Sequence, residues 1–256
     1  MATRALLVGI NDYPDAPLRG CRNDALDLGH RLVARGAQTT TLLDSDATKA
    51  NIKDVLEDLV FSSRMGDHII WGFSGHGTYL FDHSGDESDQ RDEALVAYDY
   101  LDGGLIVDDE IHEISVKRKR GVRFTTIADA CHVGTITRFA PNSKPYGDAK
   151  FLSPLTFLEG AERTRVLQTR GLPSIRPRNN TSTILMAACK ETQVAYDAEF
   201  NGRPNGAFTR ALLDALPEHR VTYGAWMAST TALLDKRTYP QDPQFFGKRW
   251  QRYLPF

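Results

Sequence analysis

Apolar residues in the first half of the chain alternate between short runs and helical spacing. Short apolar or β-branched runs predict strands at Ala5–Ile10, Thr39–Leu43, His68–Phe73 and Val122–Asp129. Helical spacing predicts helices within Cys21–Gly36, Ala47–Phe61 and Asp108–Val116. Strands joined by helical crossovers are typical of a mainly parallel sheet with helices on both faces. The expected fold class is therefore α/β.

The pattern breaks in residues 136–180, which are rich in proline and arginine. A connection of this length is usually either functional or disordered. Regular spacing returns with a strand in Ser182–Cys189, helices in Gly206–Leu216 and Tyr223–Lys236, and an extended segment at Pro243–Phe246. We expect one domain over residues 1–256, made of a larger part (1–135), an arginine-rich connecting loop (136–180) and a smaller part (181–256).

Composition narrows the class of protein. The 256 residues are 41% hydrophobic and 25% charged, with a formal net charge of −2, which is ordinary for a soluble globular protein and favours neither nucleic acid nor membrane as a partner. No apolar run is long enough to cross a bilayer, and the N-terminus lacks the pattern of a signal peptide. Three widely spaced cysteines argue against a disulfide framework and for a reducing, cytoplasmic location.

Two glycine-flanked motifs follow successive predicted strands. SGHG contains His76, and DACHVG contains Cys131, 55 residues later. Because ligand sites of parallel sheets lie at the carboxyl ends of the strands, we expect the two motifs to meet. An imidazole beside a thiol can take its proton, and nearby backbone N–H groups can bind an oxyanion. The pair predicts nucleophilic catalysis, with Cys131 as nucleophile and His76, rather than His132, as base.

Other interpretations of these residues stay open. A single cysteine at a strand end is commonly a small buried apolar residue, and a single histidine there is commonly structural. The chain could then be a catalytically silent interaction module, or a cysteine hydrolase or acyltransferase that does not cut peptides. No phosphate-binding loop motif is present.

Taken together, the motifs resemble the metacaspases and their prokaryotic relatives among the caspase-like cysteine peptidases. The resemblance covers ALLVGINDYPDAPLRGCRNDA, FSGHG, GDESDQRDEALVAYD, IVDDEI, DACHVGT, ILMAACKETQVAYD and GAFTRALLDAL. It implies a caspase-like three-layer sandwich and cleavage of peptide bonds by a His76/Cys131 dyad. It also implies that the amides of Gly77 and Cys131 bind the oxyanion.

The residue two positions before the nucleophile bears on specificity. Asp129 stands where caspases of the QACRG type carry a neutral glutamine, and a carboxylate there should attract a cationic side chain. The resemblance adds Asp24 and Ser74 to this pocket, although Asp24 would also suit the first turn of a helix without any function. Cleavage after Arg or Lys is therefore expected, and cleavage after Asp is not.

An acidic stretch raises the question of calcium. Eleven Asp or Glu residues and one basic residue, Arg91, lie between Asp82 and Glu110, without the spacing of an EF-hand. The resemblance places calcium ligands at Asp92, Asp108 and Asp109, whereas the family's further acid is replaced by Arg138. Two interpretations stay open: calcium as an activator that the chemistry itself does not require, and a calcium-independent enzyme whose acidic stretch is a solvated loop.

An enzyme that cuts after Arg and exposes an arginine-rich connection is expected to cut itself and to begin as a zymogen. The candidate segments are Glu159–Arg178 and Lys117–Arg120. Substrates would be proteins or peptides with Arg or Lys at the cleavage site. The resemblance favours a monomer, and a partner-activated protease is an alternative.

Overall fold

The computed structural model describes residues 1–82, 90–131, 147–169, 183–190 and 192–256. Its centre is a six-stranded sheet with the order β12-β9-β7-β3-β1-β2. All neighbouring pairs in it are parallel except β12 with β9, which confirms the expected mainly parallel sheet. The strands are β1 (Thr3–Gly9), β2 (Gln38–Leu43), β3 (His68–Ser74), β7 (Arg123–Asp129), β9 (Ile184–Ala187) and β12 (Gln244–Phe246).

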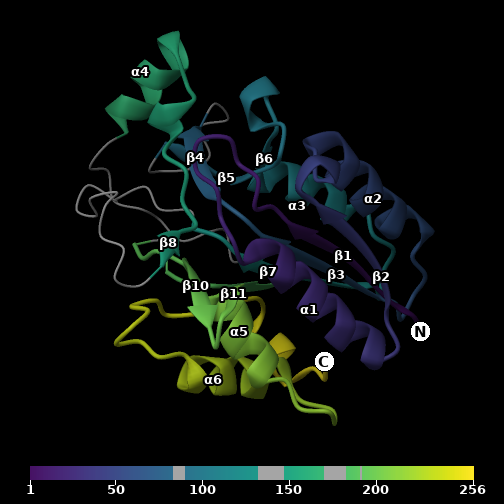
Figure 1. Ribbon diagram of the computed structural model, residues 1–256. Coiled ribbons are helices and arrows are strands. Elements are labelled where there is room, and N and C mark those ends of the chain that lie inside the picture. The colour runs from purple at the N-terminus through teal and green to yellow at the C-terminus, as the bar shows by residue number, and fades with distance from the viewer. Residues whose placement is uncertain (83–89, 132–146, 170–182, 191) are drawn as a thin grey trace.

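Helices cover both faces of this sheet (Figure 1). Those on the faces are α1 (Cys21–Ala34), α2 (Lys49–Ser62), α3 (Asp108–Val116), α5 (Ala207–Asp214) and α6 (Tyr223–Leu233), and a further helix, α4 (Gly160–Gln168), lies apart from them. Short 3-10 turns lie at Asp44–Asp46, Tyr100–Asp102, Pro154–Thr156 and Arg249–Tyr253. Helix α2 begins with a side-chain N-cap, since the Thr48 hydroxyl accepts a hydrogen bond from the amide of Asn51 at 3.2 Å.

Alternation along the strands produces the three layers. In β1, Leu7 packs in a core shared with α1, α5 and α6, whereas Leu6 and Val8 pack in a core shared with α2 and α3. Trp71 of β3 belongs to the second core, and Trp226 of α6 belongs to the first. Strands buried on both faces read as continuous apolar runs, which is why the sequence predicted them.

Two small sheets were not predicted. One consists of β4 (Gly77–Phe81), β5 (Arg91–Val96) and β6 (Leu105–Val107), and the other of β8 (Asp148–Ala149), β10 (Tyr196–Phe200) and β11 (Arg203–Gly206). Their strands are short, and they mix acidic or glycine residues with apolar ones, so no clear period of two appears. They matter for function because β4 begins directly after His76.

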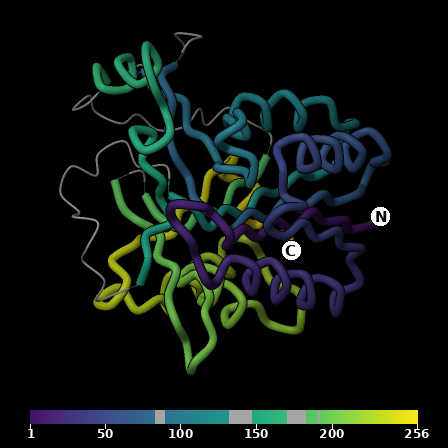
Figure 2. Tube along the Cα trace, turned by 45° about the horizontal axis from the view of Figure 1, so that its top comes forward, coloured from purple at the N-terminus to yellow at the C-terminus, as the bar shows by residue number. Residues whose placement is uncertain are grey.

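Helix α4 corrects the prediction that residues 136–180 form an open loop throughout. It stands away from the central sheet (Figure 1 and Figure 2), and Val166 is its buried residue. Thr169, just after it, accepts hydrogen bonds from Arg91 of β5. The sequence pattern missed this helix because one buried side chain in nine residues gives no amphipathic signal.

A buried histidine links strands β3 and β7 of the central sheet to helix α6. His68 Nε2 lies 3.0 Å from the hydroxyl of Thr125 and 2.9 Å from that of Tyr223 on α6. Burial lowers the pKa of His68 to about 3, so the imidazole is neutral at neutral pH.

Among the described residues, no helix has the length and apolar character that crossing a bilayer requires.

The buried, neutral His68 predicts a loss of stability in mild acid. The unfolded chain protonates this histidine near pH 6.5 while the folded chain does not, so stability falls as the pH drops below that value. Between pH 6.5 and 5 the expected loss from His68 is about 2 kcal/mol, at about 1.4 kcal/mol per pH unit. Urea unfolding at both pH values should show a smaller difference in His68→Gln than in the wild type, and an unchanged one in the exposed-site control His112→Gln. Equal pH dependence in His68→Gln would contradict the assignment.

Candidate active site

The two motifs meet at the carboxyl ends of neighbouring parallel strands, as the topology predicted. Ser74 of β3 pairs with Asp129 of β7, and His76 and Cys131 each follow two residues later. The amides of Gly77 and Cys131 point at one acceptor, the carbonyl oxygen of Lys150, at 3.0 and 3.1 Å. These two donors are the ones expected to bind an oxyanion.

The backbone carbonyl group that orients the His76 ring was not predicted from the sequence. His76 Nε2 donates to the carbonyl oxygen of Ala16 at 2.7 Å, since a carbonyl only accepts. Tyr13 lies against the ring at 4.6 Å between centroids, and its hydroxyl accepts from the His76 amide at 3.2 Å. Burial lowers the pKa of His76 to about 4, so the ring is neutral. Nδ1, buried and without a hydrogen-bond partner among the described residues, then holds the lone pair of a base.

The thiol of Cys131 is fully buried and is held by the main chain. Its Sγ accepts a hydrogen bond from the amide of Ala195 at 2.6 Å. In this arrangement the imidazole and the thiol lie at adjacent strand ends without a hydrogen bond between them in the described part of the chain. All three cysteines are free and buried.

A lysine that sequence reasoning overlooked fills the predicted specificity pocket. The Lys150 ammonium lies 3.0 Å from Asp24 Oδ2, 3.2 Å from Asp129 Oδ2 and 2.8 Å from Ser74 Oγ. Its side chain is completely buried. Burial opposes the charge, but the carboxylates of Asp129 and Asp24 outweigh it and raise the pKa of Lys150 well above its ordinary value. The pocket therefore holds a charged ammonium group.

The start of α5 holds both carboxylates in place. The amide of Gly206 donates to Asp24 at 2.9 Å, and the amide and hydroxyl of Thr209 donate to Asp129 Oδ2 at 3.0 and 2.6 Å. The first amides of a helix lack partners within the helix, so carboxylates satisfy them well. The sequence signal was Gly206, the first residue of GAFTRALLDAL, but only the fold shows what this helix start faces.

Two glycines are required by close approach. A Cβ on Gly206 would lie 2.1 Å from Asp129 Oδ2 and 2.3 Å from Lys150 Nζ, so a side chain there would fill the pocket. A Cβ on Gly77 would lie 2.0 Å from the carbonyl oxygen of Cys131. Both positions need the absence of a side chain rather than an unusual backbone angle.

The residues expected to bind calcium are placed separately from this pocket. Asp92 lies in β5, and Asp108 and Asp109 form the first turn of α3. Among the described residues, no three His, Cys, Asp or Glu side chains are grouped as a metal site would require. Among the described residues, Asp92, Asp108 and Asp109 therefore do not form a calcium site by themselves, and Arg138 lies outside these residues.

The described parts of the segments expected to be self-cleaved lie outside the site. Lys117–Arg120 precedes β7, at the end of the strand opposite to Cys131. In Glu159–Arg178, residues 160–168 form α4, where helical hydrogen bonding opposes the extended conformation of a protease substrate, and residues 170–178 lie outside the described residues.

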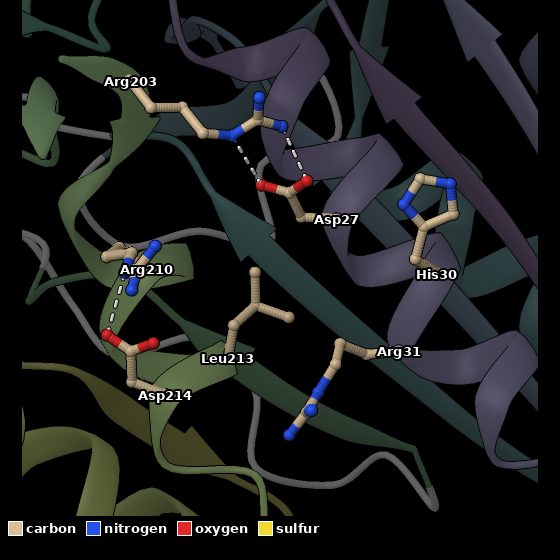
Figure 3. A pocket seen from close by; sticks show the side chains of 7 residues that line it. All are labelled: Asp27, His30, Arg31, Arg203, Arg210, Leu213 and Asp214. Carbon is tan, nitrogen blue, oxygen red and sulfur yellow. Dashed lines mark hydrogen bonds and ion pairs between the residues drawn. The ribbon is translucent and has the colours of Figure 1, made fainter. Parts of the chain in front are cut away.

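A solvent-open hollow of about 580 Å³ lies elsewhere, between α1, β11 and α5. Figure 3 shows Arg203 of β11 paired with Asp27 of α1, and Arg210 paired with Asp214 one turn further along α5. None of its lining residues belongs to the dyad or to the acidic pocket. The paired charges give it the character of a solvated surface.

Comparison with known proteins bears on this geometry. A family model described as "Metacaspase, peptidase C14 domain" matches residues 3–139. Metacaspase-1 of Kluyveromyces lactis is 29% identical over 94% of this chain and 65% of that relative. Metacaspase-1B of Aspergillus fumigatus is 31% identical over 94% of this chain and 68% of that relative. The chain thus spans about two thirds of the length of these relatives.

The fold has a counterpart among solved structures. The crystal structure of protein GSU0716 from Geobacter sulfurreducens matches with a TM-score of 0.73 and 25% identity, over 97% of this chain and 94% of that one. The match supports the three-layer α/β architecture described above. Together with the family model and the relatives, it shows that this chain belongs to the metacaspase family of C14 peptidases.

Proposed function

We propose that this chain is a cysteine endopeptidase that cuts peptide bonds after Lys or Arg. One observation carries the proposal: a lysine of the chain itself occupies the acidic pocket while its carbonyl oxygen accepts from the amides of Gly77 and Cys131. A substrate that is about to be cut needs its side chain and its carbonyl bound in this combination.

The proposed chemistry uses the groups around that carbonyl. His76 Nδ1 takes the proton of the Cys131 thiol, and the thiolate attacks the carbonyl carbon. The amides of Gly77 and Cys131 stabilise the oxyanion, while the Ala16 carbonyl keeps Nε2 protonated and the ring oriented. His76 then gives its proton to the leaving amine, and water hydrolyses the thioester. For the first step the thiol must turn from the Ala195 amide toward the imidazole.

Specificity follows from charge in a dry pocket. Two carboxylates and a hydroxyl surround the Lys150 ammonium, and no solvent reaches it. An aspartate side chain in the same place would face two like charges, which costs several kcal/mol. The pocket thus supports Lys and Arg and opposes Asp.

Self-processing and calcium activation are further parts of the proposal. A chain that carries its own lysine in the pocket is a natural first substrate, and it would begin as a zymogen. Calcium stays a prediction from the acidic stretch, with Asp92, Asp108 and Asp109 as its expected ligands. The free thiols fit a reducing compartment such as the cytoplasm.

A catalytically silent interaction module is the second candidate. It is favoured by the buried state of the thiol, which bonds to Ala195 rather than to His76. In that case Lys150 would be a permanent structural ion-pair partner of Asp24 and Asp129.

The test is hydrolysis of fluorogenic peptides ending in Arg, Lys or Asp, with and without calcium. We expect release after Arg and Lys, none after Asp, and none in Cys131→Ala. Addition of a chelator should lower the rate if calcium activates. Release after Asp alone would refute the pocket assignment, and no release under any condition would favour the interaction module.

A further inference from the structure

Residues 148–152 cross the site, beginning as the short strand β8 and bending at Lys150. Asp148 and Ala149 form β8, antiparallel to β10, and the Lys150 amide donates to the carbonyl of Ala195 at 2.9 Å. On the other side of Lys150, the amide of Leu152 donates to the carbonyl of Gly77 at 3.0 Å. The main chain is therefore fixed both before and after the Lys150 carbonyl. Strand addition of this kind is a common way to bind an extended peptide.

The residue after Lys150 lies on an aromatic surface. The rings of Phe151 and Tyr79 are nearly parallel, at 14°, with 6.2 Å between their centroids. This is offset stacking, which favours aromatic pairs beyond the burial of apolar area. The next residue, Leu152, is 4% exposed and belongs to the core shared with α2 and α3.

The surface under Phe151 is rigidly supported. Tyr79 is 7% exposed, and the guanidinium of Arg91 lies 4.8 Å from the centroid of its ring. Arg91 in turn donates to the hydroxyl and carbonyl of Thr169 at the end of α4. A tyrosine stacked on an arginine that is itself held in place is a preformed binding surface.

We propose that Lys150–Phe151 is the bond that this enzyme cuts in its own chain, and that Tyr79 is the residue that selects an aromatic side chain on the leaving side of a cut bond. This inference rests on the proposed function and deepens it. It replaces the segments that the sequence had suggested with one bond, and it extends the substrate from a basic residue to a basic residue followed by an aromatic one.

The cleavage step balances without a further reactant except water. The bond between the Lys150 carbonyl carbon and the Phe151 nitrogen breaks, and a thioester between Lys150 and Cys131 Sγ forms. The thiol proton passes through His76 to the Phe151 nitrogen, which leaves as an amine. Water then hydrolyses the thioester, restores the thiol and leaves Lys150 as a new C-terminus. Release of this end would empty the acidic pocket for other substrates.

The bond is tested on the full chain by intact mass measurement and N-terminal sequencing during incubation. We expect a fragment that begins at Phe151 and is absent in Cys131→Ala. For cleavage within one chain, its first-order rate constant should be independent of protein concentration. Lys150→Arg should be cut at the same bond, and Lys150→Gln should be cut there at least tenfold more slowly. Cleavage at any other bond, or equal cleavage in Lys150→Gln, would overturn this assignment.

The leaving-side surface is tested with two quenched peptides that differ in one position, Ala-Lys-Phe-Leu and Ala-Lys-Gly-Leu. The wild type should cut the Phe peptide with at least a tenfold higher kcat/KM, and Tyr79→Ala should reduce this ratio to near one. Tyr79→Phe should keep the ratio, as should the exposed-site control Tyr253→Ala. A ratio near one in the wild type, or an equal loss on both peptides in Tyr79→Ala, would refute the role of Tyr79.

A third substrate distinguishes failure of this inference from failure of the proposed function. A lysyl coumarin amide has no residue on the leaving side. If the enzyme hydrolyses it while the chain stays uncut and the peptide ratio is one, the inference fails and the proposed function stands. If neither the amide nor the chain is cut, both fail.

Discussion

Replacing His76 with alanine is expected to lower kcat/KM for an arginyl peptide by about 10³-fold or more, since a positioned acid–base group contributes about 10²–10⁴ and works as a unit with its nucleophile. The reason lies in the buried Nδ1 and in the Ala16 carbonyl, which fixes the proton on Nε2. Release of coumarin from the peptide measures the effect.

A histidine on α3 supplies the matched control. His112 is exposed, and His112→Ala should hydrolyse the peptide as the wild type does. The residual rate of His76→Ala should increase with pH, because hydroxide from solvent then replaces the imidazole as the group that takes the thiol proton. Retention of more than a tenth of the activity in His76→Ala would rule out this residue as the base.

Replacing Asp129 with asparagine is expected to lower kcat/KM for arginyl and lysyl peptides by about 10²-fold, because breaking a buried charge pair costs about 2–5 kcal/mol. Asparagine keeps the shape and can still accept from Thr209, so the change removes charge more than structure. The effect is measured as kcat/KM on arginyl, lysyl and neutral glutaminyl peptides.

The ratio between these peptides distinguishes specificity from folding. Asp129→Asn should lose activity on the basic peptides but not on the glutaminyl one. Asp214→Asn, an exposed-pair variant on helix α5, whose first turn contacts Asp129, should change neither. Equal losses on all peptides in Asp129→Asn would mean that Asp129 supports the structure of the site rather than the choice of substrate.

Sequence patterns predicted the central fold well where burial is two-sided. The centres of β1 and β3 are near-continuous apolar runs because both faces are covered, and β7 mixes β-branched with apolar residues. Helix α3 has the predicted bounds. The small sheets were missed because their strands are short and mix acidic or glycine residues with apolar ones, and α4 was missed because it buries a single side chain. Local sequence patterns predicted the order of the strands only in part, since the pairing of β7 with β9 joins residues about 60 positions apart.

The candidate site was also predictable from the sequence only in part. His76, Cys131 and Asp129 were predictable because each follows a recognisable strand within a glycine-flanked motif. Lys150, Tyr79 and the carbonyl of Ala16 were not, because no local pattern distinguishes a lysine, a tyrosine or an alanine that meets the site from a distance.

The sequence by itself determined the layered α/β architecture, the family, and the residues at the two strand ends, because periodicity and short motifs are local properties of the chain. The tertiary structure alone decided what fills the acidic pocket, which nitrogen of His76 is available, and which ring lies under Phe151. Those facts depend on contacts between residues up to 126 positions apart, such as Asp24 with Lys150, and such contacts exist only after the sheet has assembled.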